Sequence, residues 1–96
     1  MIPTLKRYVI EREIPGVGKL SREQLKQTAM TSLEAAAKLY GKIQWEHSNI
    51  TADKTFCVHL ADSEASILEH AQLAGFPANK ITEALTVINP MTAFQD

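Results

Sequence analysis

The chain has 96 residues, of which 45% are hydrophobic and 22% charged, and its formal net charge is −1. This length and composition predict one globular domain and exclude a disordered chain, and the near-neutral charge argues against binding nucleic acid or an anionic membrane. No apolar run approaches the roughly 20 residues of a membrane span, and residues 1–6 lack a signal peptide's apolar stretch. The single cysteine fits a reducing compartment, so we expect a cytoplasmic protein.

The first half of the chain predicts a strand followed by a helix. Residues 7–14 are rich in β-forming side chains, and alternation places Tyr8 and Arg12 on the same face. Ser21 and the glutamine three residues later form a capping box for a helix expected over residues 22–40, whose apolar side chains recur at helical spacing.

A β-hairpin is expected next. Residues 42–50 and 54–61 predict two strands joined by a short loop. Alternation along the second strand separates an apolar set from a more polar set, and we expect the apolar set to face the helices. The apolar set is Phe56, Val58 and Leu60, and the other set is Thr55, Cys57 and His59.

The remaining residues predict a helix, a strand and a tail. Asp62 or Ser63 is expected to cap a helix over residues 64–74, and Phe76-Pro77-Ala78-Asn79 predicts a turn after it. Residues 81–88 predict the last strand, and residues 89–96 an arm or loose tail.

The resulting order, β-α-β-β-α-β, predicts an α+β, ferredoxin-like fold for a single domain spanning residues 1–96. Right-handed crossovers place both helices on one face of a four-stranded antiparallel sheet. The other face is left open, and we expect a second copy to cover it in a homodimer. The residues that compete for this open face, depending on register, are Tyr8 or Val9, Trp45, Cys57, His59, and Leu85 or Val87.

Several short motifs occur in a characteristic order. They are Tyr8-Val9-Ile10-Glu11-Arg12-Glu13-Ile14-Pro15-Gly16, Trp45-Glu46-His47-Ser48, Asp53-Lys54-Thr55-Phe56-Cys57-Val58, Glu69-His70-Ala71, Gly75-Phe76-Pro77-Ala78 and Ile88-Asn89-Pro90-Met91-Thr92-Ala93. This order resembles a small group of bacterial proteins described as nickel-binding or nickel-responsive-regulator-like. The resemblance covers nearly the whole chain, and the motifs around Cys57 and His70 are its most specific parts.

The resemblance implies a ferredoxin-like fold, a dimer and, in some members, nickel binding. Two residues depart from the pattern. His59 stands where an aromatic residue, often Tyr, is expected, which adds a candidate metal ligand. Asn89 stands where Asp is common, which removes a candidate carboxylate.

Cys57 and His59 are the first candidate metal ligands. They are two residues apart on one predicted strand, so their side chains share a sheet face. A thiolate and an imidazole suit Ni²⁺ or another divalent transition metal, and a second copy would have to supply further ligands. The structural alternative is that Cys57 is a small buried hydrophobe and His59 a half-exposed, hydrogen-bonded strand residue.

His47 and His70 are weaker candidates for the same metal. If His47 pairs opposite Cys57 the two share a face, and a register shift of one residue brings Glu46 there instead. His70 is expected on the flank of the second helix, where the alternative role is a hydrogen bond to a neighbouring turn or strand. The spacing of the three histidines matches no compact metal motif.

Other residues are candidates for a pocket or an interface. Glu11, Arg12 and Glu13 form a charge cluster at the end of the first strand. Glu11 and Glu13 share a face and could act as paired carboxylates, although charges at a strand end are more often solvated. Tyr8 and Trp45 are expected in the core or at a dimer contact, and Glu46 joins this set if the register favours it.

Two kinds of function follow, with a third as the plainest alternative. The first is a homodimer that binds nickel or a similar ion through Cys57, His59, His47 and His70. The second is a small-molecule enzyme or binder of the dimeric α/β-barrel type, with a ligand held between sheet and helices in a cavity lined by Tyr8, Trp45, Cys57, His59 and His70. The third is an interaction module that binds no ligand. The sequence leaves open whether the chain is an enzyme.

Overall fold

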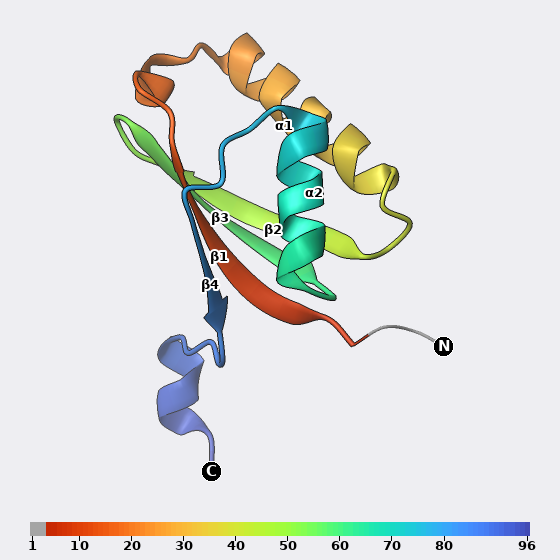
Figure 1. Ribbon diagram of the computed structural model, residues 1–96. Coiled ribbons are helices and arrows are strands. Elements are labelled where there is room, and N and C mark those ends of the chain that lie inside the picture. Colours follow the sequence, from red (N-terminus) through yellow and green to blue (C-terminus); the bar gives the residue numbers. More distant parts are fainter. Residues whose placement is uncertain (1–3) are drawn as a thin grey trace.

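Four antiparallel strands form one sheet in the order β2-β3-β1-β4, and both helices cover the same face of it (Figure 1). The structure is a computed structural model that describes residues 4–96. Its elements are β1 (Lys6–Glu13), η1 (Val17–Lys19), α1 (Arg22–Ala37), β2 (Ile43–Ile50), β3 (Lys54–Ala61), α2 (Glu64–Ala74), β4 (Lys80–Ala84) and η2 (Pro90–Phe94), where η marks a 3₁₀ helix. The ferredoxin-like α+β fold is confirmed. Residues 1–3 of the predicted domain lie outside the described residues.

Helix α1 begins as predicted and ends earlier. The Ser21 side chain accepts from the backbone of Gln24, and the Gln24 side chain accepts in return from the backbone of Ser21. The helix stops at Ala37, before a turn in which Tyr40 and Gly41 both have positive φ. Neither helix within residues 4–96 has the length and apolar character needed to cross a bilayer.

The two faces of β3 are the reverse of the prediction. Tyr8 lies opposite His59, and Ile10 lies opposite Cys57, so these side chains share a face. That face is buried under the helices, with exposed fractions of 6% for Tyr8 and 8% for Cys57. The apolar set of Phe56, Val58 and Leu60 is half-buried on the open side. The prediction from apolar character was wrong because the face under the helices holds several buried polar side chains.

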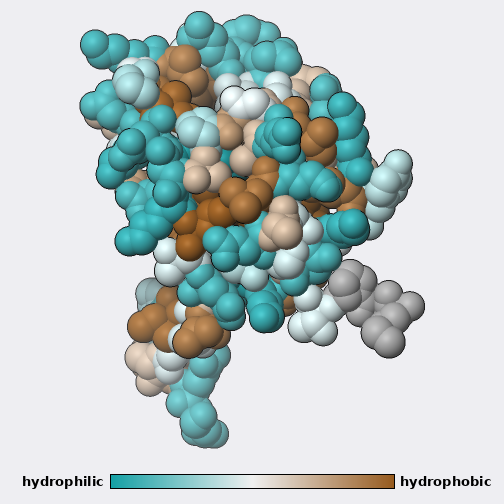
Figure 2. Space-filling view, viewed as in Figure 1, coloured by the Kyte–Doolittle hydropathy of each residue, from teal (hydrophilic) through white to brown (hydrophobic). Residues whose placement is uncertain are grey.

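Strand β4 is shorter than predicted. It pairs with β1 only from Lys80 to Ala84, so the predicted strand residues Leu85 and Val87 lie beyond it. Leu85 is 89% exposed, and apolar side chains gather on the C-terminal segment, which extends away from the body of the molecule (Figures 1 and 2). The predicted tail contains η2, which is capped by the side chain of Asn89.

The loop between β1 and α1 is fastened to the β2–β3 hairpin. The backbone N–H of Gly18 donates to the carbonyl of Ala52 at 3.0 Å, and that of Gly16 to the Asp53 carboxylate at 2.9 Å. A Cβ at Gly18 would lie 2.8 Å from the backbone oxygen of Thr51. Glycine is required here by the close approach of two backbones.

Candidate ligand cavity

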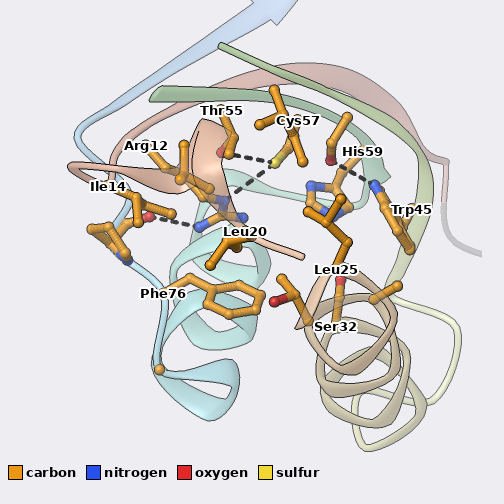
Figure 3. Close-up of a pocket in the computed structure, with 17 residues that line it drawn as sticks. Arg12, Ile14, Leu20, Leu25, Ser32, Trp45, Thr55, Cys57, His59 and Phe76 are labelled. Atoms are coloured by element: carbon orange, nitrogen blue, oxygen red, sulfur yellow. Dashed lines mark hydrogen bonds between the residues drawn. The ribbon is translucent and has the colours of Figure 1, made fainter. Parts of the chain in front are cut away.

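A cavity of about 410 Å³ lies between the sheet and the helices (Figure 3). Its walls come from β1, β2, β3, α1, the η1 loop and the turn after α2. Most of the lining side chains are apolar, and a few polar groups reach it from the sheet. The apolar walls include Ile14, Val17, Leu20, Leu25, Ala29, Trp45, Ile50, Phe76 and Pro77. Such a chamber is typical of a binding site for a small organic molecule.

Arg12 places a guanidinium inside this cavity. The residue is 2% exposed, and its Nη1 donates to the carbonyl of Pro77 at 2.7 Å. Its Nε donates to the Sγ of Cys57 at 3.4 Å, and its guanidinium carbon lies 5.6 Å from the centre of the Phe76 ring. Among residues 4–96, Nη2 finds no hydrogen-bond partner. Arg12 is therefore a buried cation with one unused donor group.

No ion pair within residues 4–96 neutralises Arg12. The ion pairs among the described residues join Arg7 to Glu46 and Lys54 to Glu11, so neither includes Arg12. A buried charge is costly unless it is paired, because burial removes its hydration. The guanidinium therefore favours a negative group beside it.

Cys57 contacts both Arg12 and Thr55. Its Sγ lies 3.4 Å from the Thr55 hydroxyl as well as from Arg12 Nε, and all three side chains are buried. The prediction that Cys57 and His59 share a sheet face is confirmed by their common burial under the helices. The prediction that this is the open face is wrong.

His59 is a buried imidazole on the cavity wall. It is 1% exposed, and neither ring nitrogen has a hydrogen-bond partner in the described part of the chain. Burial, and then the nearby His70 and Arg12, lower the pKa of His59 from 6.5 to about 3. The ring is therefore neutral at pH 7, with one nitrogen available as a donor and the other as an acceptor.

His70 lies behind His59. It is fully buried, and the two ring centres are 5.0 Å apart with a tilt of 57°. Its Nε2 lies 3.1 Å from the carbonyl oxygen of Ser32, which only accepts, so Nε2 carries the proton. Burial lowers its pKa, although this hydrogen bond partly opposes the shift. A hydrogen bond was the predicted alternative, but its partner is α1 instead of a turn or strand, and His70 is fully buried instead of lying on the flank of its helix.

Strand β2 contributes Trp45 to the cavity wall, whereas His47 on the same strand does not line the cavity. Trp45 pairs with His59 and Ser48 with Cys57, while a bulge between Trp45 and His47 turns His47 outward, opposite Val58. Trp45 lines the cavity and donates from its Nε1 to the Ser48 hydroxyl at 2.9 Å. The sequence left open whether His47 or Glu46 shares a face with Cys57, and the bulge excludes His47 because it changes the alternation.

The predicted acidic candidates also lie away from the cavity. Glu46 pairs with Arg7, with oxygen and nitrogen 2.6 Å apart, and Glu11 pairs with Lys54 at 3.3 Å. All four side chains are partly exposed. Tyr8 is a core residue and does not line the cavity.

A resident metal ion does not fit the donors present. Within residues 4–96 there is no cluster of three or more His, Cys, Asp or Glu side chains arranged to hold one ion. Cys57, His59 and His70 lie under the helices, whereas His47 is exposed on the other side of the sheet.

Sequence reasoning treated Arg12 as part of a solvated charge cluster. The available signal was its alternation with Tyr8 and Ile10, two residues that are 6% and 0% exposed. Phe76 was predicted only as part of a turn, and nothing local marks it as a cavity wall.

Comparisons with known proteins identify relatives by sequence and by fold. A family model described as "Nickel responsive protein SCO4226-like" matches residues 8–84. The crystal structure of SCO4226 from Streptomyces coelicolor A3(2) superimposes with a TM-score of 0.71 and 16% identity, covering 85% of this chain and 99% of that one. At this identity the superposition shows a common fold. A comparison with curated proteins finds no match.

Proposed function

The chain belongs to the family of nickel responsive proteins like SCO4226, and within that family we propose that it binds a small, mainly apolar organic molecule in the cavity between sheet and helices. The observation that carries this proposal is the cavity itself, about 410 Å³ in size, with apolar walls and the polar side chains of Arg12 and His59 inside. This combination of an apolar body and a few directed polar groups is what ligand sites share.

Trp45 makes binding measurable without a label. It is the only tryptophan of the chain and lines the cavity, so a bound aromatic molecule will change its fluorescence. The probe is N-phenyl-1-naphthylamine, a neutral fluorophore that brightens in apolar surroundings. We expect saturable binding that quenches Trp45.

A matched pair of variants on α1 tests where the probe binds. Ala29 lines the cavity, whereas Ala37 is exposed at the end of the same helix. Ala29→Phe should weaken probe binding at least tenfold by filling the cavity, and Ala37→Phe should bind like the wild type. Circular dichroism checks that each variant is folded. Absence of binding to the wild type, or equal binding to both variants, would overturn the proposal.

Nickel is the second candidate ligand, and the family description supports it. The candidate donors Cys57, His59 and His70 form no cluster that could hold one ion within residues 4–96, so this candidate rests on the family description alone. Titration of the reduced protein with Ni²⁺, with Cys57→Ser alongside, tests this candidate. Stoichiometric binding that is lost in Cys57→Ser would support it over the organic ligand.

A homodimer belongs to the same proposal. The half-buried Val9, Val58 and Leu60 on the open sheet face, and the exposed apolar side chains after Ala84, offer surface for a second copy. Light scattering after gel filtration measures the mass directly, and a monomer at micromolar concentration would overturn this part. The cytoplasmic location stays a prediction from the single cysteine.

A further inference from the structure

We propose that the ligand of this cavity is an amphipathic carboxylic acid whose carboxylate binds Nη2 of Arg12 and whose apolar body lies against the walls. The inference rests on the proposed function and specifies its chemistry. Three observations support it: the unpartnered donor of Arg12, the absence of an ion pair to Arg12 among residues 4–96, and the apolar lining of the cavity.

The guanidinium is held in place before any ligand arrives. Nε is fixed by Cys57, Nη1 by the Pro77 carbonyl, and the plane lies near the Phe76 ring. Two of the three nitrogens are therefore committed. The third is buried and has no partner within residues 4–96, so an incoming carboxylate must displace neighbouring side chains slightly to reach it. A donor fixed in advance binds more tightly, because less side-chain entropy is lost on binding.

The acceptor that suits this donor is a carboxylate. A charge-assisted hydrogen bond to a guanidinium is about twice as strong as a neutral one, and more so where water is excluded. A phosphate would bring more charge than one free nitrogen can satisfy between apolar walls. A neutral amide would leave the buried cation without a counter-charge.

His59 offers a place for a second polar group on the same ligand. It lies two residues beyond Cys57 on β3, about 7 Å along the strand, and both of its ring nitrogens lack partners among residues 4–96. A neutral imidazole presents one donor and one acceptor, which matches a hydroxyl group. The ligand is thus a hydroxylated acid with its hydroxyl several ångströms from the carboxylate.

The decisive comparison uses 2-naphthoate and 2-naphthamide, which share shape and apolar area and differ in charge. Trp45 fluorescence reports both. We expect the wild type to prefer the acid by about 10- to 100-fold. The Arg12→Met variant should still bind 2-naphthamide but should no longer prefer the acid. The Arg12→Lys variant should keep part of the preference for the acid.

The outcomes separate the two proposals. If neither compound binds, the proposed function fails. If the amide binds as tightly as the acid, the cavity is a binding site and the carboxylate inference is overturned. The preference of the wild type is decisive by itself should Arg12→Met not fold.

The hydroxyl is tested with 6-hydroxy-2-naphthoate. It should bind the wild type more tightly than 2-naphthoate, and His59→Phe should remove that gain without removing the preference for acid over amide. An unchanged gain in His59→Phe would overturn the role of His59.

Discussion

Arg12 Nε lies 3.4 Å from Cys57 Sγ, a contact between neighbouring strands that places a cation against a thiol inside an apolar cavity. Both residues are buried, at 2% and 8% exposure. The contact orients the guanidinium so that Nη1 meets the Pro77 carbonyl, while Nη2 has no partner within residues 4–96. The positioning of the only charged group lining the cavity within residues 4–96 therefore depends on Cys57.

Removing the acceptor at Cys57 should destabilise the fold. Cys57→Ser keeps an oxygen that accepts from Arg12, whereas Cys57→Val is apolar and leaves a buried Nε–H without a partner. We expect the valine variant to be less stable than the serine variant by about 1–3 kcal/mol in urea unfolding. Equal stabilities, or a more stable valine variant, would show that the contact does not hold Arg12.

Acid should destabilise the protein through His59. The unfolded imidazole takes up a proton below about pH 6.5, while the folded one does so only near pH 3. Between these values the unfolded state binds more protons, so stability is lost as pH falls. At pH 5 the free energy of unfolding should be lower than at neutral pH by about 2 kcal/mol.

His59→Phe should reduce the loss of stability with falling pH. Part of the loss should remain, because the pKa of His70 is also lowered. His47 is exposed on the open face, so His47→Gln is the matched control and should keep the wild-type slope. Urea unfolding at pH 5 and pH 7.5 measures the change in unfolding free energy for each variant. A wild-type slope in His59→Phe would contradict the account.

Gly18→Ala should loosen the wall of the cavity. Its added Cβ would lie 2.8 Å from Thr51 O and 2.9 Å from Ala52 Cα, both backbone atoms, so the hairpin must shift. We expect a loss of about 1–3 kcal/mol in unfolding free energy and weaker probe binding, because the adjacent Val17 lines the cavity.

Gly16→Asn is the control for this change. A Cβ at Gly16 meets no atom of residues 4–96 within 4 Å, and asparagine tolerates its positive φ. Its stability should stay within about 1 kcal/mol of the wild type. If both variants unfold alike, the close approach at Gly18 is not what matters.

Phe94→Asp should weaken self-association without destabilising the fold. Phe94 is 80% exposed on the C-terminal segment, so its replacement removes no core packing. Tyr40→Asp changes an aromatic residue that is 91% exposed in the turn after α1 and serves as the control. Light scattering should show a lower mass for Phe94→Asp alone. The same mass for both variants would exclude the segment from the interface.

The order of elements was predictable because each has strong local signals. Ser21 and its capping box mark the start of α1, and the helix predicted over residues 64–74 matches α2. Which face of each strand is covered by the helices was harder to predict. On β3 the apolar Phe56 lies on the open side and His59 inside, since the register with β1, rather than hydropathy, determines which side is covered.

The site could be predicted only in part. Cys57 and His59 were singled out and do line one cavity, and His70 lies behind His59. The position of His47 could not be derived, because a bulge has no local signature in this strand and one extra residue reverses the side chains that follow. Arg12 was missed because a charged residue at a strand end is usually solvated.

The most direct measurement is a nitrogen-15 NMR titration of the wild-type protein with 2-naphthoate. The chain has three arginines and one tryptophan, so the side-chain N–H signals of Arg7, Arg12, Arg22 and Trp45 are few and assignable. We predict saturable shifts of Arg12 Nε–H and Trp45 Nε1–H, with Arg7 and Arg22 unchanged. Saturable shifts confined to Arg7 or Arg22, or no saturable shift at all, would contradict a ligand site in this cavity.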